Sequence, residues 1–141
     1  MDTTTTTSTA QTTQSIYPAV RYRDAKAAIE WLKRLGFEEH LVCPGDGDTI
    51  AHAELKVAGH LIMLGSVKDD PYARSPLDLG GTSASVYIAV DSPKEIDEWY
   101  ERAKTIGATI VRAPCDTDYE SREFGLRDPE GHGWSFGTYR P

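Results

Sequence analysis

Apolar and polar residues alternate along this chain in two similar blocks. In the first block, stretches that alternate with period two are typical of strands with one buried face, and one stretch carries apolar residues at helical spacing. Asp24 is placed to cap the N-terminus of that helix, and Gly36 is placed to end it. This block therefore predicts a strand, a helix and three strands, over residues 16–23, 25–35, 37–42, 49–57 and 60–65.

The second block repeats this order. Ser92-Pro93-Lys94-Glu95 has the form of a capping box with proline at the first helical position, and Gly107 ends the predicted helix. Strands are expected on either side of it, over residues 82–90, 108–113, 121–127 and 132–139. Two βαβββ units in tandem follow, which makes the fold class α+β.

The last strand has faces of very different size. Asp128 to Gly131 has turn chemistry, and after it Trp134 and Phe136 point to one side of the strand. Gly133, Ser135 and Gly137 point to the other side, which leaves room for another molecule. Gly59 to Gly65 shows the same G-H-x-x-x-x-G spacing, which supports an internal duplication.

The remaining segments divide the chain. Residues 1–15 are Thr-rich and carry little to bury, so a disordered tail is predicted. Residues 66–81 are predicted to be a structureless linker, whose length is typical of a lid or a binding loop. The two modules are then residues 16–65 and 82–141, and together they form one domain over residues 16–141.

Charge and hydropathy exclude several kinds of partner. The net charge of −7 and the absence of any Lys or Arg run argue against nucleic acid and anionic membranes. No apolar segment reaches the length of a membrane span, and no signal region begins the chain, so a cytoplasmic location is expected. Cys43 and Cys115 are expected to be ordinary thiols.

Three motifs carry a resemblance to a known family. They are Val-x-x-x-Asp at 20–24, Leu-Gly-Phe at 35–37, and Arg-Glu-Phe-Gly-Leu-Arg-Asp-Pro-Glu-Gly-His-Gly-Trp-Ser-Phe-Gly-Thr-Tyr at 122–139. Over residues 16–140 the chain resembles the vicinal oxygen chelate superfamily, which includes glyoxalase I, extradiol dioxygenases and bleomycin-resistance drug-binding proteins. The resemblance implies curved mixed sheets around a cavity, helices on the outer faces, and a homodimer whose chains both contribute strands to each cavity.

The metal enzymes of this superfamily place ligands at four strand positions. Those positions fall here on Tyr17, Met63, Ser85 and Ser135, none of which supplies an imidazole or a carboxylate. We therefore expect no metal and no other cofactor. His52 and Glu54 share one face of a strand and could form a substitute metal site, or simply a polar patch on the sheet.

The candidate ligand-binding residues are those whose strand parity places them on the cavity side. Glu123 belongs to this group, although an ion pair with a neighbouring arginine explains it as well as a place in the pocket. The complete set is Tyr17, Arg21, His52, Glu54, Met63, Ser85, Tyr87, Glu123 and Ser135.

Two functions remain compatible with this pattern. The first is a metal-independent binding protein of the glyoxalase/bleomycin-resistance type that sequesters a small aromatic or amphipathic compound. The alternative is a glyoxalase-like enzyme of lyase, isomerase or dioxygenase type. It would use Tyr17 or Glu123 as acid or base, or an unrecognised metal site.

Overall fold

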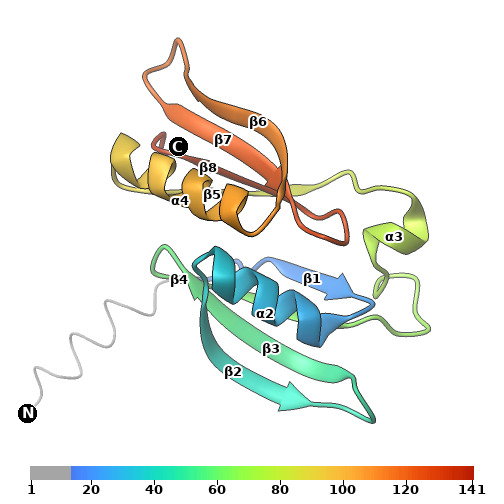
Figure 1. The fold of residues 1–141 in the computed structure, drawn as a ribbon. Coiled ribbons are helices and arrows are strands. Elements are labelled where there is room, and N and C mark those ends of the chain that lie inside the picture. The colour runs from blue at the N-terminus through green and yellow to red at the C-terminus, as the bar shows by residue number, and fades with distance from the viewer. Residues whose placement is uncertain (1–13) are drawn as a thin grey trace, which may run out of the picture.

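The computed structural model describes residues 14–141 as two modules of the same topology (Figure 1). Each module is a mixed four-stranded sheet whose first strand runs parallel to its last, with the other pairs antiparallel. The first has the order β1-β4-β3-β2, built from β1 (Ala19–Tyr22), α2 (Ala25–Leu35), β2 (Glu38–Pro44), β3 (Ile50–Val57) and β4 (His60–Ser66). The second has the order β5-β8-β7-β6, built from β5 (Ser85–Ala89), α4 (Pro93–Thr105), β6 (Thr109–Asp116), β7 (Arg122–Arg127) and β8 (Gly133–Gly137). The predicted tandem βαβββ fold is confirmed.

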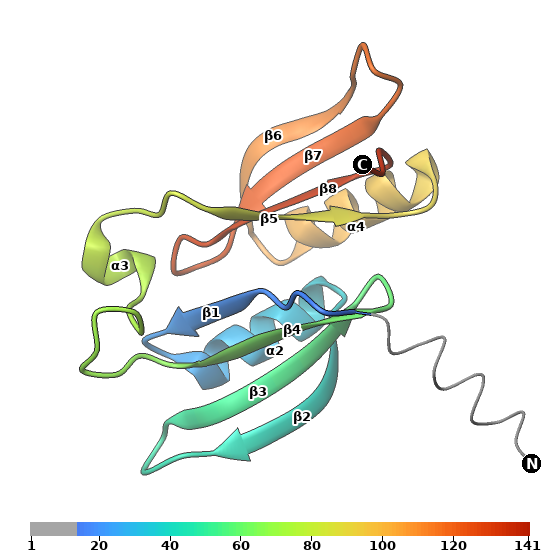
Figure 2. The ribbon, with the colours of Figure 1, turned by 180° about the vertical axis from the view of Figure 1, so that it is seen from behind.

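Both long helices lie on the same side of the two sheets, as Figures 1 and 2 show from opposite directions. The apolar face of each strand packs against them, so Trp134 and Phe136 are buried as their parity predicts. Aromatic rings connect the modules: Phe37 of the first lies edge-on to Trp99 and Trp134 of the second. Within residues 14–141, neither long helix covers the opposite face of the sheets, which is called the open face below.

The start and end of α2 follow the predicted caps. The Asp24 carboxylate accepts a hydrogen bond from the backbone N–H of Ala27 at 3.0 Å. Gly36 ends the helix with a φ of 132°, and a Cβ there would lie 2.9 Å from the Trp99 ring. Only glycine satisfies both the backbone conformation and this close approach between modules.

The linker between the modules is more ordered than the sequence predicts. It contains a short helix, α3 (Pro76–Leu79), so the expectation of a structureless segment over 66–81 is wrong. Ser75 caps this helix and Asp78 completes a capping box with it. The signal was present in Ser75-Pro76-Leu77-Asp78, which has the same form as the box that begins α4.

The turn before β8 joins both modules and the linker. The Asp128 carboxylate accepts hydrogen bonds from Tyr22 Oη at 2.6 Å and Trp134 Nε1 at 3.0 Å. Burial, together with the nearby Asp128 charge, raises the pKa of Tyr22 well above its ordinary value, so the phenol stays protonated and donates. Glu130 accepts from the backbone N–H groups of Arg23 and Asp24 and from Ser75 Oγ, at 2.7, 2.8 and 2.6 Å.

The N-terminal region differs in part from the prediction. Most of the predicted disordered tail, residues 1–13, lies outside the described residues. Gln14 is not part of such a tail, because its side-chain amide pairs with the backbone N–H and C=O of Leu61, both at 2.8 Å. No helix within residues 14–141 is long and apolar enough to span a membrane.

Candidate functional site

Small residues line the open face of the second sheet, opposite the helices. Gly133 lies opposite Ser85 across the β5–β8 pair, and a Cβ at Gly133 would come within 3.2 Å of the Ser85 Cβ. Ser135 lies opposite Gly125 of β7, where an added Cβ would meet nothing closer than 3.8 Å. The strands can therefore pack closely while the space above Gly125 and Ser135 stays open.

A hollow of about 820 Å³ lies over these small residues. One wall is the linker around α3, another is the turn that holds Glu130, and Leu77 and Val111 contribute exposed apolar surface. Its volume is in the range of small-molecule sites. The complete lining is Pro76, Leu77, Gly80, Gly81, Thr82, Ser83, Ala84, Ser85, Val111, Gly125, Leu126, Arg127, Glu130, Gly131, Gly133, Trp134 and Ser135.

A second hollow of about 480 Å³ adjoins the first at the seam between the modules. It lies between β1 and β5, which are edge strands of different sheets. Ser85, Gly133 and Trp134 line both hollows. Because they share these lining residues, the two hollows are neighbours along the seam, and both belong to the candidate site.

The predicted site residues divide into two groups. Ser85 and Ser135 line the larger hollow, and Tyr17 and Tyr87 line the smaller one together with Ser85. The others line neither hollow: Arg21, His52, Glu54, Met63 and Glu123. Strand parity alone places a residue on the open face, but it does not say which part of that face is hollowed.

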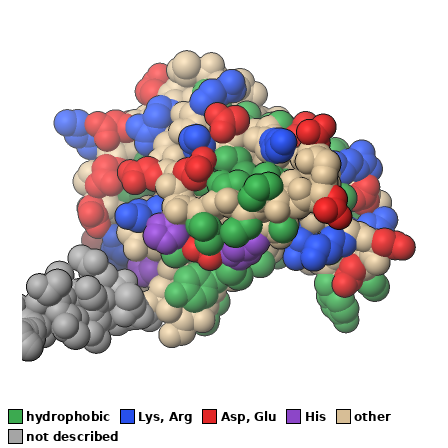
Figure 3. All heavy atoms as spheres, turned by 90° about the horizontal axis from the view of Figure 1, so that it is seen from below, with side chains coloured by type: hydrophobic (Ala, Val, Ile, Leu, Met, Phe, Trp, Pro, Cys, Tyr) green, Lys and Arg blue, Asp and Glu red, His purple; other side chains and the backbone are tan. Residues whose placement is uncertain are grey.

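His52 and Glu54 form a polar cluster on the first sheet instead. His52 Nε2 lies 2.8 Å from Glu54 Oε2, and His40 Nε2 lies 3.9 Å from Glu54 Oε1. Figure 3 views the molecule from the side of β2 and β3 and shows histidine side chains gathered there beside acidic and apolar groups. Within residues 14–141, no group of three or more His, Cys, Asp or Glu is arranged to hold a metal ion.

Glu123 is held in a network at the far end of the open face. Its carboxylate accepts from Arg112 Nη2 at 2.8 Å and from Tyr119 Oη at 2.9 Å, and the residue is 6% exposed. Burial, the largest single influence, pushes the pKa of Glu123 up, but the donors Tyr119, Ser121 and Arg112 together lower that pKa below its usual range. The structure thus shows the arginine ion pair, and a carboxylate held ionised in this way is a poor general acid.

Two tyrosines of the open face are held by backbone oxygens. Tyr87 Oη donates to the carbonyl of Tyr139 at 2.7 Å, and its ring lies over Gly137, where a Cβ would clash with it. Tyr17 Oη donates to the carbonyl of Gln14 at 2.9 Å. Both rings therefore offer surface to the smaller hollow, while their hydroxyls are already engaged.

The four positions expected for metal ligands do not converge. Tyr17 precedes β1, Met63 lies between Ala19 and Glu54 in the first sheet, and only Ser85 and Ser135 share the larger hollow. Hydroxyl and thioether groups are also weak or soft donors for the divalent cations that the family binds. These residues do not fit a metal of that type.

Several lining residues were not identified from the sequence. Arg127 and Gly125 share strand parity with Glu123, so alternation along β7 could have identified them. The linker residues from Pro76 to Gly81 could not be identified in this way, because a loop has no periodicity that predicts which surface it covers.

The fold defines a class of protein, in which two βαβββ modules stand in tandem, with a hollow on the open face of the second sheet. The sequence model of the Glyoxalase/Bleomycin resistance protein/Dioxygenase superfamily matches residues 14–136, and the chain belongs to this superfamily. The predicted relationship to vicinal oxygen chelate proteins is thereby confirmed.

Individual relatives agree with this assignment. The uncharacterised Mycobacterium bovis protein Mb0911c is 31% identical over 129 residues, covering 87% of this chain and 82% of its own length. TioX from Micromonospora sp. ML1 has a similar structure, with a TM-score of 0.70 and 31% identity over 91% of this chain and 98% of TioX. The fosfomycin resistance protein FosX from Listeria monocytogenes, solved with Mn(II) and sulfate, shares the fold at 15% identity and a TM-score of 0.65, over 91% and 93% of the two chains.

Proposed function

We propose that this chain is a metal-independent binding protein that sequesters a small aromatic or amphipathic compound in the larger hollow. The main support for this function is the larger hollow, which lies over Gly125 and Ser135 and has a volume of about 820 Å³. A site of this size with apolar walls and a few polar groups is typical of small-molecule binding.

The chemistry of the walls supports an amphipathic ligand. Leu77 and Val111 offer exposed apolar surface, and the hydroxyls of Ser85 and Ser135 offer polar contacts within the same hollow. The neighbouring rings of Tyr17 and Tyr87 extend this surface along the seam. An aromatic compound with one or a few polar substituents matches this arrangement.

Metal independence is supported by the donor set, since Tyr17, Met63, Ser85 and Ser135 supply neither imidazole nor carboxylate. Elemental analysis after mild purification tests it. One equivalent of Zn, Ni, Fe or Mn per chain, with a binding activity that EDTA removes, would contradict this part of the proposal.

The site itself is tested by filling the hollow. Ser135→Trp should abolish binding of the fluorescent probe N-phenyl-1-naphthylamine while the thermal melt stays cooperative, because the helix-facing side of β8 is unchanged. The matched control is Glu98→Trp, which adds the same side chain on an exposed position of α4. If Ser135→Trp keeps the probe affinity of the control, or unfolds the protein, the proposed site is wrong.

A further inference from the structure

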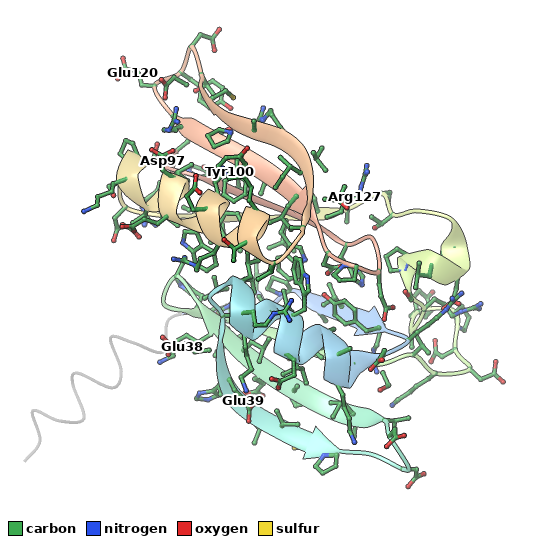
Figure 4. All side chains as sticks on the ribbon, viewed as in Figure 1. Glu38, Glu39, Asp97, Tyr100, Glu120 and Arg127 are labelled. Carbon is green, nitrogen blue, oxygen red and sulfur yellow. The ribbon has the colours of Figure 1, made fainter. Side chains whose placement is uncertain are left out.

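One cation on the larger hollow lacks a partner within residues 14–141. Arg127 is exposed at the end of β7, lines the hollow, and lies opposite Gly133 across the β7–β8 pair. Figure 4 shows it at the end of the sheet nearest the linker. In residues 14–141, its guanidinium makes no hydrogen bond or ion pair with another side chain or with the backbone.

This situation is unusual for an arginine of this protein. Of the arginines in the described part of the chain, only Arg34 and Arg127 lack such a partner. The chain carries 22 acidic residues against 15 basic ones, so carboxylates are the more abundant group. Arg127 alone of these two arginines lies on the larger hollow.

The other charged groups near the hollow are already engaged. Both carboxylate oxygens of Glu130 accept hydrogen bonds, from Ser75 Oγ and from the backbone N–H groups of Arg23 and Asp24. Arg112, which lies opposite Gly125, is paired with Glu123 at 2.8 Å. The charge available to a bound molecule is therefore the positive charge of Arg127.

We infer that the ligand of this hollow carries an oxyanion, such as a carboxylate or a sulfonate, on its apolar body, and that Arg127 binds this group. The inference rests on the proposed function, since it specifies the ligand class of the same site. A guanidinium presents parallel N–H donors that match an oxyanion in a bidentate manner. The hydroxyls of Ser85 and Ser135 lie on the same hollow and can donate to the same or a neighbouring polar group.

Two probes that differ only in an anionic group provide the test. 8-Anilinonaphthalene-1-sulfonate and N-phenyl-1-naphthylamine share the anilinonaphthalene body, and only the first carries a sulfonate. Their dissociation constants are measured by fluorescence titration for the wild type, Arg127→Gln, Arg127→Lys and Arg34→Gln. Arg34→Gln removes the same charge from an exposed position of α2 away from the larger hollow.

We expect Arg127→Gln to weaken binding of the sulfonate about tenfold, the size of one charge-assisted hydrogen-bonded contact, and to leave the neutral probe unchanged. Arg127→Lys should restore part of the loss, and Arg34→Gln should change neither probe. Added salt should weaken sulfonate binding in the wild type but much less in Arg127→Gln.

The contrary results separate the two proposals. If the neutral probe binds and Ser135→Trp abolishes its binding, but the sulfonate affinity does not depend on Arg127, the hollow is a ligand site and the oxyanion inference is wrong. Equal losses of sulfonate binding in Arg127→Gln and Arg34→Gln would also overturn it, because net charge would then explain the effect. If neither probe binds the wild type, both proposals fail.

Discussion

Asp128 connects more parts of the molecule than its place in a turn indicates. Its carboxylate accepts from Tyr22 Oη, from Trp134 Nε1 and from the backbone N–H groups of Glu130 and His132. The sequence predicts the turn from Pro129 and Gly131, but not these contacts, because Tyr22 is 106 residues away along the chain. Alternation along the strand correctly predicts that Trp134 is buried. A buried indole N–H needs a hydrogen-bond acceptor, but the sequence does not show which residue supplies it.

Removing this carboxylate should destabilise the protein strongly. Asp128→Ala leaves the buried Tyr22 hydroxyl and Trp134 N–H without their acceptor, so we expect a loss of about 3 kcal/mol in the free energy of unfolding. Urea denaturation measures it. Asp118→Ala, at an exposed position, is the control and should change stability by less than about 0.5 kcal/mol. Similar values for both variants would show that the Asp128 network contributes little.

The Glu123 carboxylate should make a pH-dependent contribution to the free energy of unfolding. Because its pKa is lowered in the folded protein, its charge stabilises the fold above the unfolded-state pKa of about 4.3, and this contribution disappears as pH falls through the folded pKa. Glu123→Gln should therefore be less stable than the wild type at pH 6, with a difference that shrinks below about pH 4. Exposed Glu120→Gln should show no such trend in denaturant melts. A difference between Glu123→Gln and the wild type that is constant from pH 3 to 7 would contradict this assignment.

At the scale of elements, regular strands and helices could be predicted and the linker could not. Alternation along β8 assigns Trp134 to the core and Ser135 to the open face, and both assignments agree with the structure. The four residues of α3 are too few for periodicity to identify, so only the capping box of Ser75 and Asp78 indicated that helix.

Ser75 should control the order of the linker. Its hydroxyl accepts from the backbone N–H of Leu77 and donates to Glu130, which ties α3 to the turn before β8. Ser75→Ala should speed amide hydrogen exchange in residues 67–84 by about tenfold or more, since about 1–2 kcal/mol of local stability is lost. Ser83→Ala, on the same segment and exposed, is the matched control. Equal exchange in the two variants would show that Ser75 does not hold the linker.

At the scale of the whole molecule, the duplication was visible in the sequence, but the position of the hollow was not. Repeated patterns predict two equivalent sheets, yet only the second has the larger hollow, because the linker and the turn at Glu130 form walls beside it alone. Met63 lies on the open face of the first sheet, as strand alternation predicts. It lies outside both hollows because the walls of the larger hollow stand beside the second sheet. Where modules sit depends on contacts distant in sequence, which local patterns do not encode.

We propose that the molecule is a homodimer, as the family resemblance implies. β2 and β6 are edge strands that expose Leu41 and Val111, and such open edges favour pairing with a second copy. Light scattering at micromolar concentration should give about twice the chain mass of 15.6 kDa. A mass equal to one chain across the concentration range would contradict the dimer.

Native mass spectrometry of protein purified from its own host tests most directly whether the larger hollow holds a small molecule. We expect the wild type to carry an additional mass of a few hundred daltons that organic solvent releases, consistent with a volume of about 820 Å³. Ser135→Trp, prepared identically and folded by circular dichroism, should lack that mass, and Glu98→Trp should retain it. A wild-type protein without any bound compound, or a compound retained equally by Ser135→Trp, would contradict the account.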